Sequence, residues 1–137
     1  MEFTIDHLGI AVKSLAAAKT IYERLGMNVS PEETVEQEKV RLVMVPVGES
    51  RLELLEATSE DSTIAKFIAK HGEGLHHVCL RVPDLEASVA KLKSDGVRLV
   101  SNLVDPPPDG PFDDLEVEVV FRDDRGTRTP FFRVVGA

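Results

Sequence analysis

The chain has 137 residues, of which 42% are apolar, and its 16 basic and 24 acidic side chains give a formal net charge of −8. This length and composition predict one globular domain with a buried core, and no apolar run is long enough to cross a membrane. The acidic balance argues against a nucleic-acid partner, which needs a basic surface.

The only cysteine, Cys79, excludes an internal disulfide and fits a reducing compartment. Residues 1–4 lack the basic stretch followed by an apolar one that begins a secretory signal. We therefore expect a cytoplasmic protein without a membrane partner.

The first half of the chain begins with a predicted strand over residues 5–12, in which His7, Gly9 and Ala11 share a small, partly polar face typical of a cavity wall. Ser14 is expected to cap a helix that ends at Gly26. Further strands are predicted over residues 27–30, 40–47 and 51–56, a loop over 31–39, and a second helix from about 61 to 71.

The second half repeats this order. His77 follows His7 by 70 residues, and the same offset carries Val12 onto Val82 and Gly26 onto Gly96. The repeat predicts a strand from residue 75 and a helix that ends at Gly96. Strands are then predicted over residues 97–100, 115–121 and 129–135, with a turn at 123–126 and irregular structure at the proline-rich residues 105–111.

The element order predicts an α+β fold of two βαβββ modules in a single domain over residues 1–137. Module 1 covers about residues 3–57, the connecting helix about 61–71, and module 2 about 74–136.

Two histidines at equivalent repeat positions point to a shared site. His7 and His77 come from the first strand of each half, and Glu53 lies between leucines in a strand, where burial is costly unless a cation or another partner is present. Two imidazoles and a carboxylate suit a divalent transition metal with open positions. These ligand types do not distinguish Co²⁺, Mn²⁺ and Zn²⁺. The alternatives are structural histidines and a surface charge at Glu53.

Two neighbours of His77 receive lesser roles. Strand alternation predicts that His76 faces away from His77, in a structural or supporting role. Cys79 shares the face of His77, but nothing marks it as an activated thiolate, so we expect a small wall residue.

Five segments occur in order at a characteristic spacing: residues 5–12, 47–48, 52–56, 61–67 and 72–78. Together they closely resemble the vicinal oxygen chelate (glyoxalase-like) superfamily and, within it, the methylmalonyl-CoA epimerase family. The resemblance runs from about residue 4 to residue 100.

The resemblance implies the vicinal oxygen chelate fold and an isomerase that interconverts (R)- and (S)-methylmalonyl-CoA. The α-proton would be removed and returned through a metal-stabilised enolate. It further implies an acyl-CoA thioester partner, a homodimer, and metal ligation by His7, Glu53 and His77. Glu53 is also the predicted catalytic residue.

The last third departs from the family pattern. Members end with a strand bearing a glutamate that ligates the metal, whereas this chain has Arg133 or Pro130 there, depending on the alignment. The opposite acid or base is unassigned, and Glu116 and Glu118 are the nearest carboxylates along the sequence. A non-catalytic small-ligand binder is therefore an alternative. A glyoxalase-like lyase is another, because the turn at residues 123–126 resembles the closing turn of that group.

Overall fold

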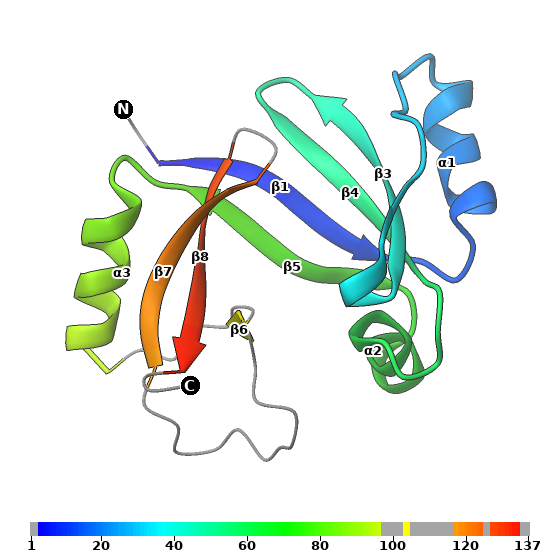
Figure 1. Cartoon of the computed structure of the whole chain (residues 1–137). Helices are drawn as coiled ribbons and strands as arrows, with labels where there is room; N and C mark the ends of the chain where they lie inside the picture. The colour runs from blue at the N-terminus through cyan, green and yellow to red at the C-terminus, as the bar shows by residue number, and fades with distance from the viewer. Residues whose placement is uncertain (1–2, 97–102, 105–116, 125–126, 135–137) are drawn as a thin grey trace. The chain divides into compact units, whose positions relative to one another are not determined.

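The computed structural model describes residues 3–96, 103–104, 117–124 and 127–134, with side chains described for residues 3–96. The chain divides into two units, Met1–Leu85 and Glu86–Ala137. Each unit has its own sheet (Figure 1). The element order confirms the α+β fold, while one domain over residues 1–137 stays a prediction.

Five strands form the sheet of the first unit, in the order β2-β3-β4-β1-β5. Strand β1 pairs parallel with β4 and antiparallel with β5, so these two flank it (Figure 1). The bounds of the five strands are β1 Thr4–Ala11, β2 Glu33–Val35, β3 Val40–Val47, β4 Ser50–Ala57 and β5 Gly74–Arg81.

Helices α1 (Leu15–Arg24) and α2 (Thr63–His71) cover opposite faces of this sheet. Neighbouring strand residues point to opposite sides, and the core divides accordingly. Leu54 packs in the cluster that contains Leu15 of α1, whereas Leu55 packs in the cluster that contains Ile64 of α2. Glu53, two residues before Leu55, therefore belongs to the α2 face.

Helix α1 begins after Ser14, as the sequence predicts, and α2 begins after Ser62, close to its predicted start at about residue 61. The hydroxyl of Ser14 accepts from the Ala17 backbone N–H at 3.2 Å, and the hydroxyl of Ser62 accepts from the Ala65 N–H at 3.0 Å. These bonds satisfy donors in the first turn that have no partner within the helix. Gly26, just after α1, has a φ of +79°, which explains the glycine there.

The prediction of a strand at residues 27–30 is wrong, and so is the prediction of a loop over residues 31–39. Met27 and Val29 pack against the α1 core without forming a strand. The backbone N–H of Met27 donates to the carbonyl of Tyr22 in α1, whereas that of Ser30 donates to the carbonyl of Met44 in β3. Because these bonds go to two different elements, no strand ladder forms. The strand is instead β2, followed by a short 3₁₀ helix, η1 (Glu36–Glu38).

Helix α3 spans Leu85–Ser94, and all of it except Leu85 belongs to the second unit. The sheet of this unit has the order β6-β8-β7, with β6 at Leu103–Val104, β7 at Val117–Asp124 and β8 at Thr127–Val134. Asp123 and Asp124, predicted as turn residues, belong to β7. The predicted strand at 97–100, the proline-rich segment 105–111 and Glu116 lie outside the described residues.

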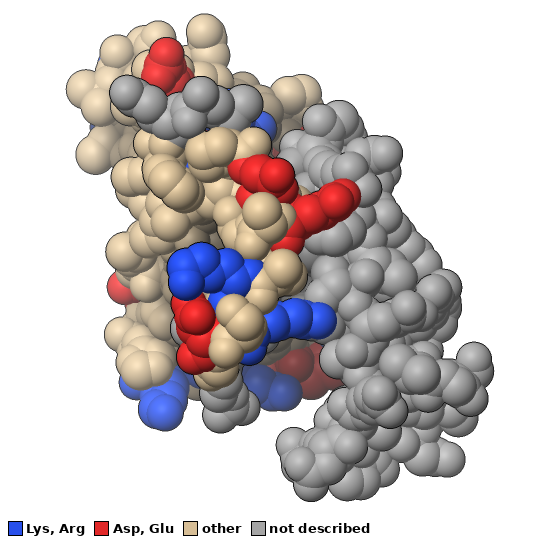
Figure 2. All heavy atoms as spheres, turned by 90° about the vertical axis from the view of Figure 1, so that its left-hand side faces the viewer, with Lys and Arg blue, Asp and Glu red and all other residues tan. Residues whose placement is uncertain are grey.

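Charged side chains of both signs lie beside one another on the face shown in Figure 2. The coloured residues there form no continuous basic surface, which agrees with the net charge of −8. Within the described ranges, none of the helices combines the length and the apolar character needed to span a bilayer.

Glu56 joins the sheet to the start of α1. Its carboxylate accepts from the Leu15 N–H at 2.5 Å and from Arg41 at 2.6 Å. Burial raises the pKa of Glu56, but the bonds from Arg41 and Leu15 outweigh burial and hold the pKa below its ordinary value. A depressed pKa adds stability above the unfolded-state pKa, and this stability is lost as the pH falls through the folded-state pKa.

We predict that Glu56→Gln lowers the free energy of unfolding by about 1 kcal/mol at pH 7, because the charge on both hydrogen bonds is lost. The difference from the wild type should shrink as the pH falls below about 4. The wild-type carboxyl is protonated first in the unfolded chain and, at still lower pH, in the folded protein. Urea unfolding of both proteins at pH 7 and pH 3.5 measures this. A difference of the same size at both pH values would contradict it.

Candidate functional site

Three side chains that the sequence predicts as ligands meet on the α2 face of the first sheet. Nε2 of His7 lies 3.4 Å from Oε2 of Glu53, and Nε2 of His77 lies 3.3 Å from the same oxygen. The two Nε2 atoms are 3.1 Å apart. We call His7, Glu53 and His77 the central triad. It comes from β1, β4 and β5, which are neighbours in the sheet.

The central triad is partly shielded from water. The side chains of His7 and Glu53 are 17% and 12% exposed, whereas that of His77 is 37% exposed. The triad is thus open to solvent mainly at His77. Glu53 is adjacent to Gly9 in the parallel β1–β4 ladder, and Gly9 is adjacent to His77 in the β1–β5 ladder.

The spacing of these three atoms fits a divalent ion. With nitrogen and oxygen ligands at about 2.1 Å, neighbouring ligand atoms lie about 3.0 Å apart in octahedral geometry and about 3.4 Å apart in tetrahedral geometry. The three separations, 3.1 to 3.4 Å, fall across this range. The 3.1 Å contact between the two Nε2 atoms also suits a hydrogen bond when Nε2 of His77 carries a proton. The group can therefore hold a metal, and which metal is not determined by its geometry.

Gly9 leaves the space that the His77 ring occupies. A Cβ at this position would lie 2.1 Å from Cε1 and 2.4 Å from Nδ1 of His77. This explains the glycine in β1, where the sequence predicted a cavity wall. Ala11, on the same face, is fully buried against the α2 core. The small residues thus make room for a histidine ring and a helix.

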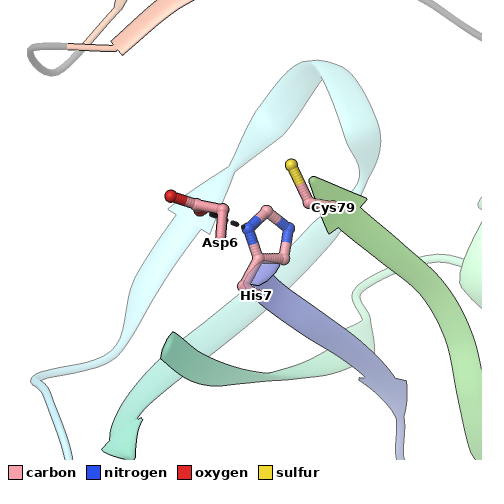
Figure 3. Close-up of side chains that lie close together, drawn as sticks. All are labelled: Asp6, His7 and Cys79. Atoms are coloured by element: carbon pink, nitrogen blue, oxygen red, sulfur yellow. Dashed lines mark hydrogen bonds and ion pairs between the residues drawn. The ribbon is translucent and has the colours of Figure 1, made fainter. Parts of the chain in front are cut away.

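Asp6 supports His7 from the side away from the central triad. Its Oδ2 accepts from Nδ1 of His7 at 2.8 Å (Figure 3). Because a carboxylate only accepts, Nδ1 carries the proton and Nε2 presents a lone pair to the central triad. Arg51 donates to Asp6 at 2.5 Å, and Arg81 donates as well. Burial raises the pKa of Asp6, but bonds from His7, Arg51 and Arg81 together lower it well below its usual range.

His76 supports His77 in a similar place. Its Nδ1 lies 2.9 Å from Nδ1 of His77, and its ring packs edge-on against Phe67 of α2, with centroids 4.9 Å apart. Burial, and then the charge of His77, lowers the pKa of His76. The expectation that His76 faces away from His77 is wrong, because an irregularity in the β1–β5 ladder interrupts the alternation.

Cys79 lies next to His7 and belongs to a second group of possible ligands, together with Asp6 (Figure 3). Burial, together with the charges of Asp6 and Glu53, raises the pKa of the Cys79 thiol. A protonated thiol is a poor ligand, and the oxygens of Asp6 already accept from His7 and two arginines. The central triad is thus the better metal site of the two.

Four residues considered in the sequence lie outside the described side chains. Pro130 and Arg133 belong to β8, opposite Phe121 and Glu118 of β7 in the ladder. Glu116 is outside the described residues altogether. The described side chains of the first unit therefore do not test these four residues, and their roles stay predictions from the sequence.

Sequence reasoning missed Asp6 and the two arginines that hold it. An acidic residue next to a candidate ligand histidine was a usable signal, because ligand histidines commonly donate their second N–H to a carboxylate. The contacts of Arg51 and Arg81 had no such signal, since they reach Asp6 from other strands.

Comparisons with known proteins agree with this architecture. The profile of the Glyoxalase/Bleomycin resistance protein/Dioxygenase superfamily matches residues 6–113. Human mitochondrial methylmalonyl-CoA epimerase is 35% identical over 102 residues, which cover 73% of this chain and 58% of the human protein. The ethylmalonyl-CoA/methylmalonyl-CoA epimerase of Cereibacter sphaeroides is 32% identical over 100 residues, or 72% of this chain and 75% of that protein.

Solved structures agree as well. A methylmalonyl-CoA epimerase variant from Streptomyces coelicolor, in complex with 2-nitronate-propionyl-CoA, superposes with a TM-score of 0.64 at 34% identity. The match covers 96% of this chain and 94% of that one. The fold and the family resemblance predicted from the sequence are confirmed. This chain therefore belongs to the Glyoxalase/Bleomycin resistance protein/Dioxygenase superfamily, and methylmalonyl-CoA epimerases are among its relatives.

Proposed function

We propose that this protein is a metal-dependent epimerase that interconverts (R)- and (S)-methylmalonyl-CoA. The observation that carries the proposal is the convergence of His7, Glu53 and His77, whose ligand atoms lie within 3.4 Å of one another. Relatives and structural neighbours named as epimerases of methylmalonyl-CoA support the choice of substrate. In this proposal the three residues are the metal ligands, and the ion is Co²⁺, Mn²⁺ or Zn²⁺.

The charges around the site suit an anionic acyl group once an ion is present. Asp6 and Glu53 contribute two negative charges, while Arg51 and Arg81, paired with Asp6, contribute two positive charges. These four side chains therefore cancel. A divalent ion would leave a local excess of two positive charges, which matches the carboxylate and the developing enolate of a methylmalonyl thioester.

A bound divalent ion supplies Lewis-acid stabilisation for the negative charge that grows on the thioester oxygen when the α-proton leaves. The protein's own residues hold the site in place. His7 and His77 present their Nε2 atoms, and Glu53 presents Oε2. The second oxygen of Glu53, Oε1, is outside the converging set, so we assign it the transfer of the α-proton.

Inversion of the α-carbon needs a second proton-transfer group on the opposite face of the substrate. Glu116 and Glu118 are the nearest carboxylates along the sequence, and both lie outside the described side chains. Arg133 and Pro130, at the place of the family's last glutamate, favour a second candidate function. In that case the protein binds a small acyl ligand without epimerising it, or acts as a glyoxalase-like lyase.

We further propose a homodimer, by analogy with the superfamily, in a reducing, cytoplasmic compartment compatible with the lone Cys79. Light scattering of the purified protein measures the mass. A monomer at micromolar concentration would remove the dimer and leave the chemistry of the site untouched.

We predict that the wild type with Co²⁺, Mn²⁺ or Zn²⁺ exchanges the α-hydrogen of methylmalonyl-CoA for deuterium in heavy water. His7→Ala and His77→Ala should lose stoichiometric metal and at least about a hundredfold in exchange rate, because each removes a ligand. Glu53→Gln should lose exchange even where some metal remains. Metal analysis and NMR of the α-carbon measure both properties.

His71→Ala is the control, because His71 contacts Phe67 and no residue of the central triad in the described interactions. Stoichiometric metal without α-hydrogen exchange in the wild type would contradict the epimerase and support the binding protein. Absence of bound metal in the wild type would contradict both the ligand assignment and the metal-dependent chemistry.

We predict that Gly9→Ala weakens metal binding about tenfold or more, because the new Cβ would overlap the His77 ring and displace Nε2. Calorimetric titration with Zn²⁺ measures the affinity. The control is Gly26→Ala, where a Cβ would meet nothing within 4 Å but a φ of +79° strains the backbone. It should lose about 1 kcal/mol of stability and keep its affinity. Equal affinities of Gly9→Ala and wild type would contradict the prediction.

A further inference from the structure

The β1–β5 ladder contains two irregularities, one in each strand. Ile5 pairs with Leu80 and His7 with Cys79, so Asp6 is one extra residue in β1. The second irregularity has the same form. Gly9 pairs with His77 and Ile10 with Leu75, so His76 is one extra residue in β5.

The two extra residues are equivalent in the repeat. Asp6 and His76 differ by the same 70 positions as His7 and His77. Each one directly precedes a histidine of the central triad. An extra residue interrupts the alternation of a strand, so two consecutive side chains can turn to the same side. Each half of the chain thus places a second polar side chain next to its ligand histidine.

In both halves, this second side chain contacts the Nδ1 atom of the histidine. Oδ2 of Asp6 is 2.8 Å from Nδ1 of His7, and Nδ1 of His76 is 2.9 Å from Nδ1 of His77. A histidine that ligates through Nε2 carries its proton on Nδ1 and donates it to a neighbouring acceptor, which fixes the ring. Asp6 provides such an acceptor in β1. In β5 the atom in the same place is a nitrogen of His76.

We propose that His76 is a positioning residue for the metal site: its Nδ1 accepts the Nδ1 proton of His77 and so holds the bare Nε2 of His77 towards Glu53. This inference rests on the metal ligation in the proposed function and assigns a partner to one of the ligands. Because His76 accepts at Nδ1, its own proton lies on Nε2.

The surroundings of His76 favour a fixed ring. Phe67 meets the ring edge-on at a centroid distance of 4.9 Å, and Phe67 itself packs against the α2 core around Ile64 and Leu55. The position of His77 is thereby set from two sides. Gly9 lies under its ring, and His76 lies at its Nδ1.

A pair of substitutions separates the hydrogen bond from the packing. His76→Phe keeps an aromatic ring against Phe67 but removes the acceptor. His76→Asn loses the ring but offers an amide oxygen near the former Nδ1 position. His71→Phe is the matched control, because it makes the same chemical change on a residue that also contacts Phe67 (ring centroids 5.0 Å apart).

We expect His76→Phe to weaken Zn²⁺ binding about 10- to 100-fold, as loss of a partner to a ligand histidine does. His76→Asn should recover most of this loss, and His71→Phe should bind like the wild type. Competition titration against a chromophoric chelator measures the affinities. In the Zn²⁺-loaded wild type, long-range ¹H–¹⁵N correlations should show His76 protonated on Nε2 and His77 protonated on Nδ1.

Three results would overturn the inference while leaving the proposed function intact. They are wild-type affinity in His76→Phe, an affinity of His76→Asn as low as that of His76→Phe, and a proton on Nδ1 of His76 in the Zn²⁺-loaded protein. The NMR measurement needs no variant, so it holds even if a substitution prevents folding. A wild type that binds no Zn²⁺ removes the ligand assignment and this inference together. Tight Zn²⁺ binding without α-hydrogen exchange removes only the epimerase.

Discussion

Backbone hydrogen bonds between β1 and β5 join two strands whose histidines are 70 residues apart in the chain. The antiparallel ladder places His77 beside Gly9 and His7 beside Cys79, and the His77 ring occupies the space over Gly9. Glu53 enters from β4 on the other side of β1. If β5 slipped by one residue, its side chains would change faces and His77 would leave the site. The candidate metal site therefore depends on this register.

Two apolar clusters hold this register from opposite sides of the sheet. Leu54 and Leu55 point into different clusters, which fixes the orientation of β4 and hence the face on which Glu53 lies. The partly buried carboxylate of Glu53 has the two histidines within 3.4 Å, and Asp6 has two arginines in addition to His7. Each acidic group near the site thus has partners that offset the cost of its burial.

The duplicated plan of the chain has different consequences in its two halves. In the ladder of β1 with β5 the repeat is visible residue by residue, down to the extra residue before each histidine. The halves differ in the side chains that surround these histidines. Gly9 makes space for the His77 ring, whereas the equivalent residue beside His7 is Cys79, and the carboxylate of Asp6 has an imidazole as its counterpart. The repeat thus provides a frame on which unequal side chains build one site.

The sequence by itself determined most of the element order, the helix start at Ser14, the approximate start of the second helix near residue 61, and the three candidate ligands. These follow from local patterns: alternation, capping residues and the spacing of repeated motifs. It failed at residues 27–39, where Met27 and Val29 pack without a ladder and β2 forms later along the chain. Tertiary contacts decided that region, because pairing with β3 makes residues 33–35 a strand, while Met27 and Val29 pack against the α1 core.

Only the tertiary structure decided the supporting shell of the site. The contacts of Asp6 with Arg51 and Arg81, and the turn of His76 towards His77, depend on register between strands that are distant in sequence. The sequence predicts which side chains of a strand alternate between its two faces. It does not predict where a strand has an extra residue, because that position is defined only by pairing with the partner strand. The candidate ligands were therefore visible in the sequence, whereas the turn of His76 towards His77 became visible only once β1 and β5 were paired.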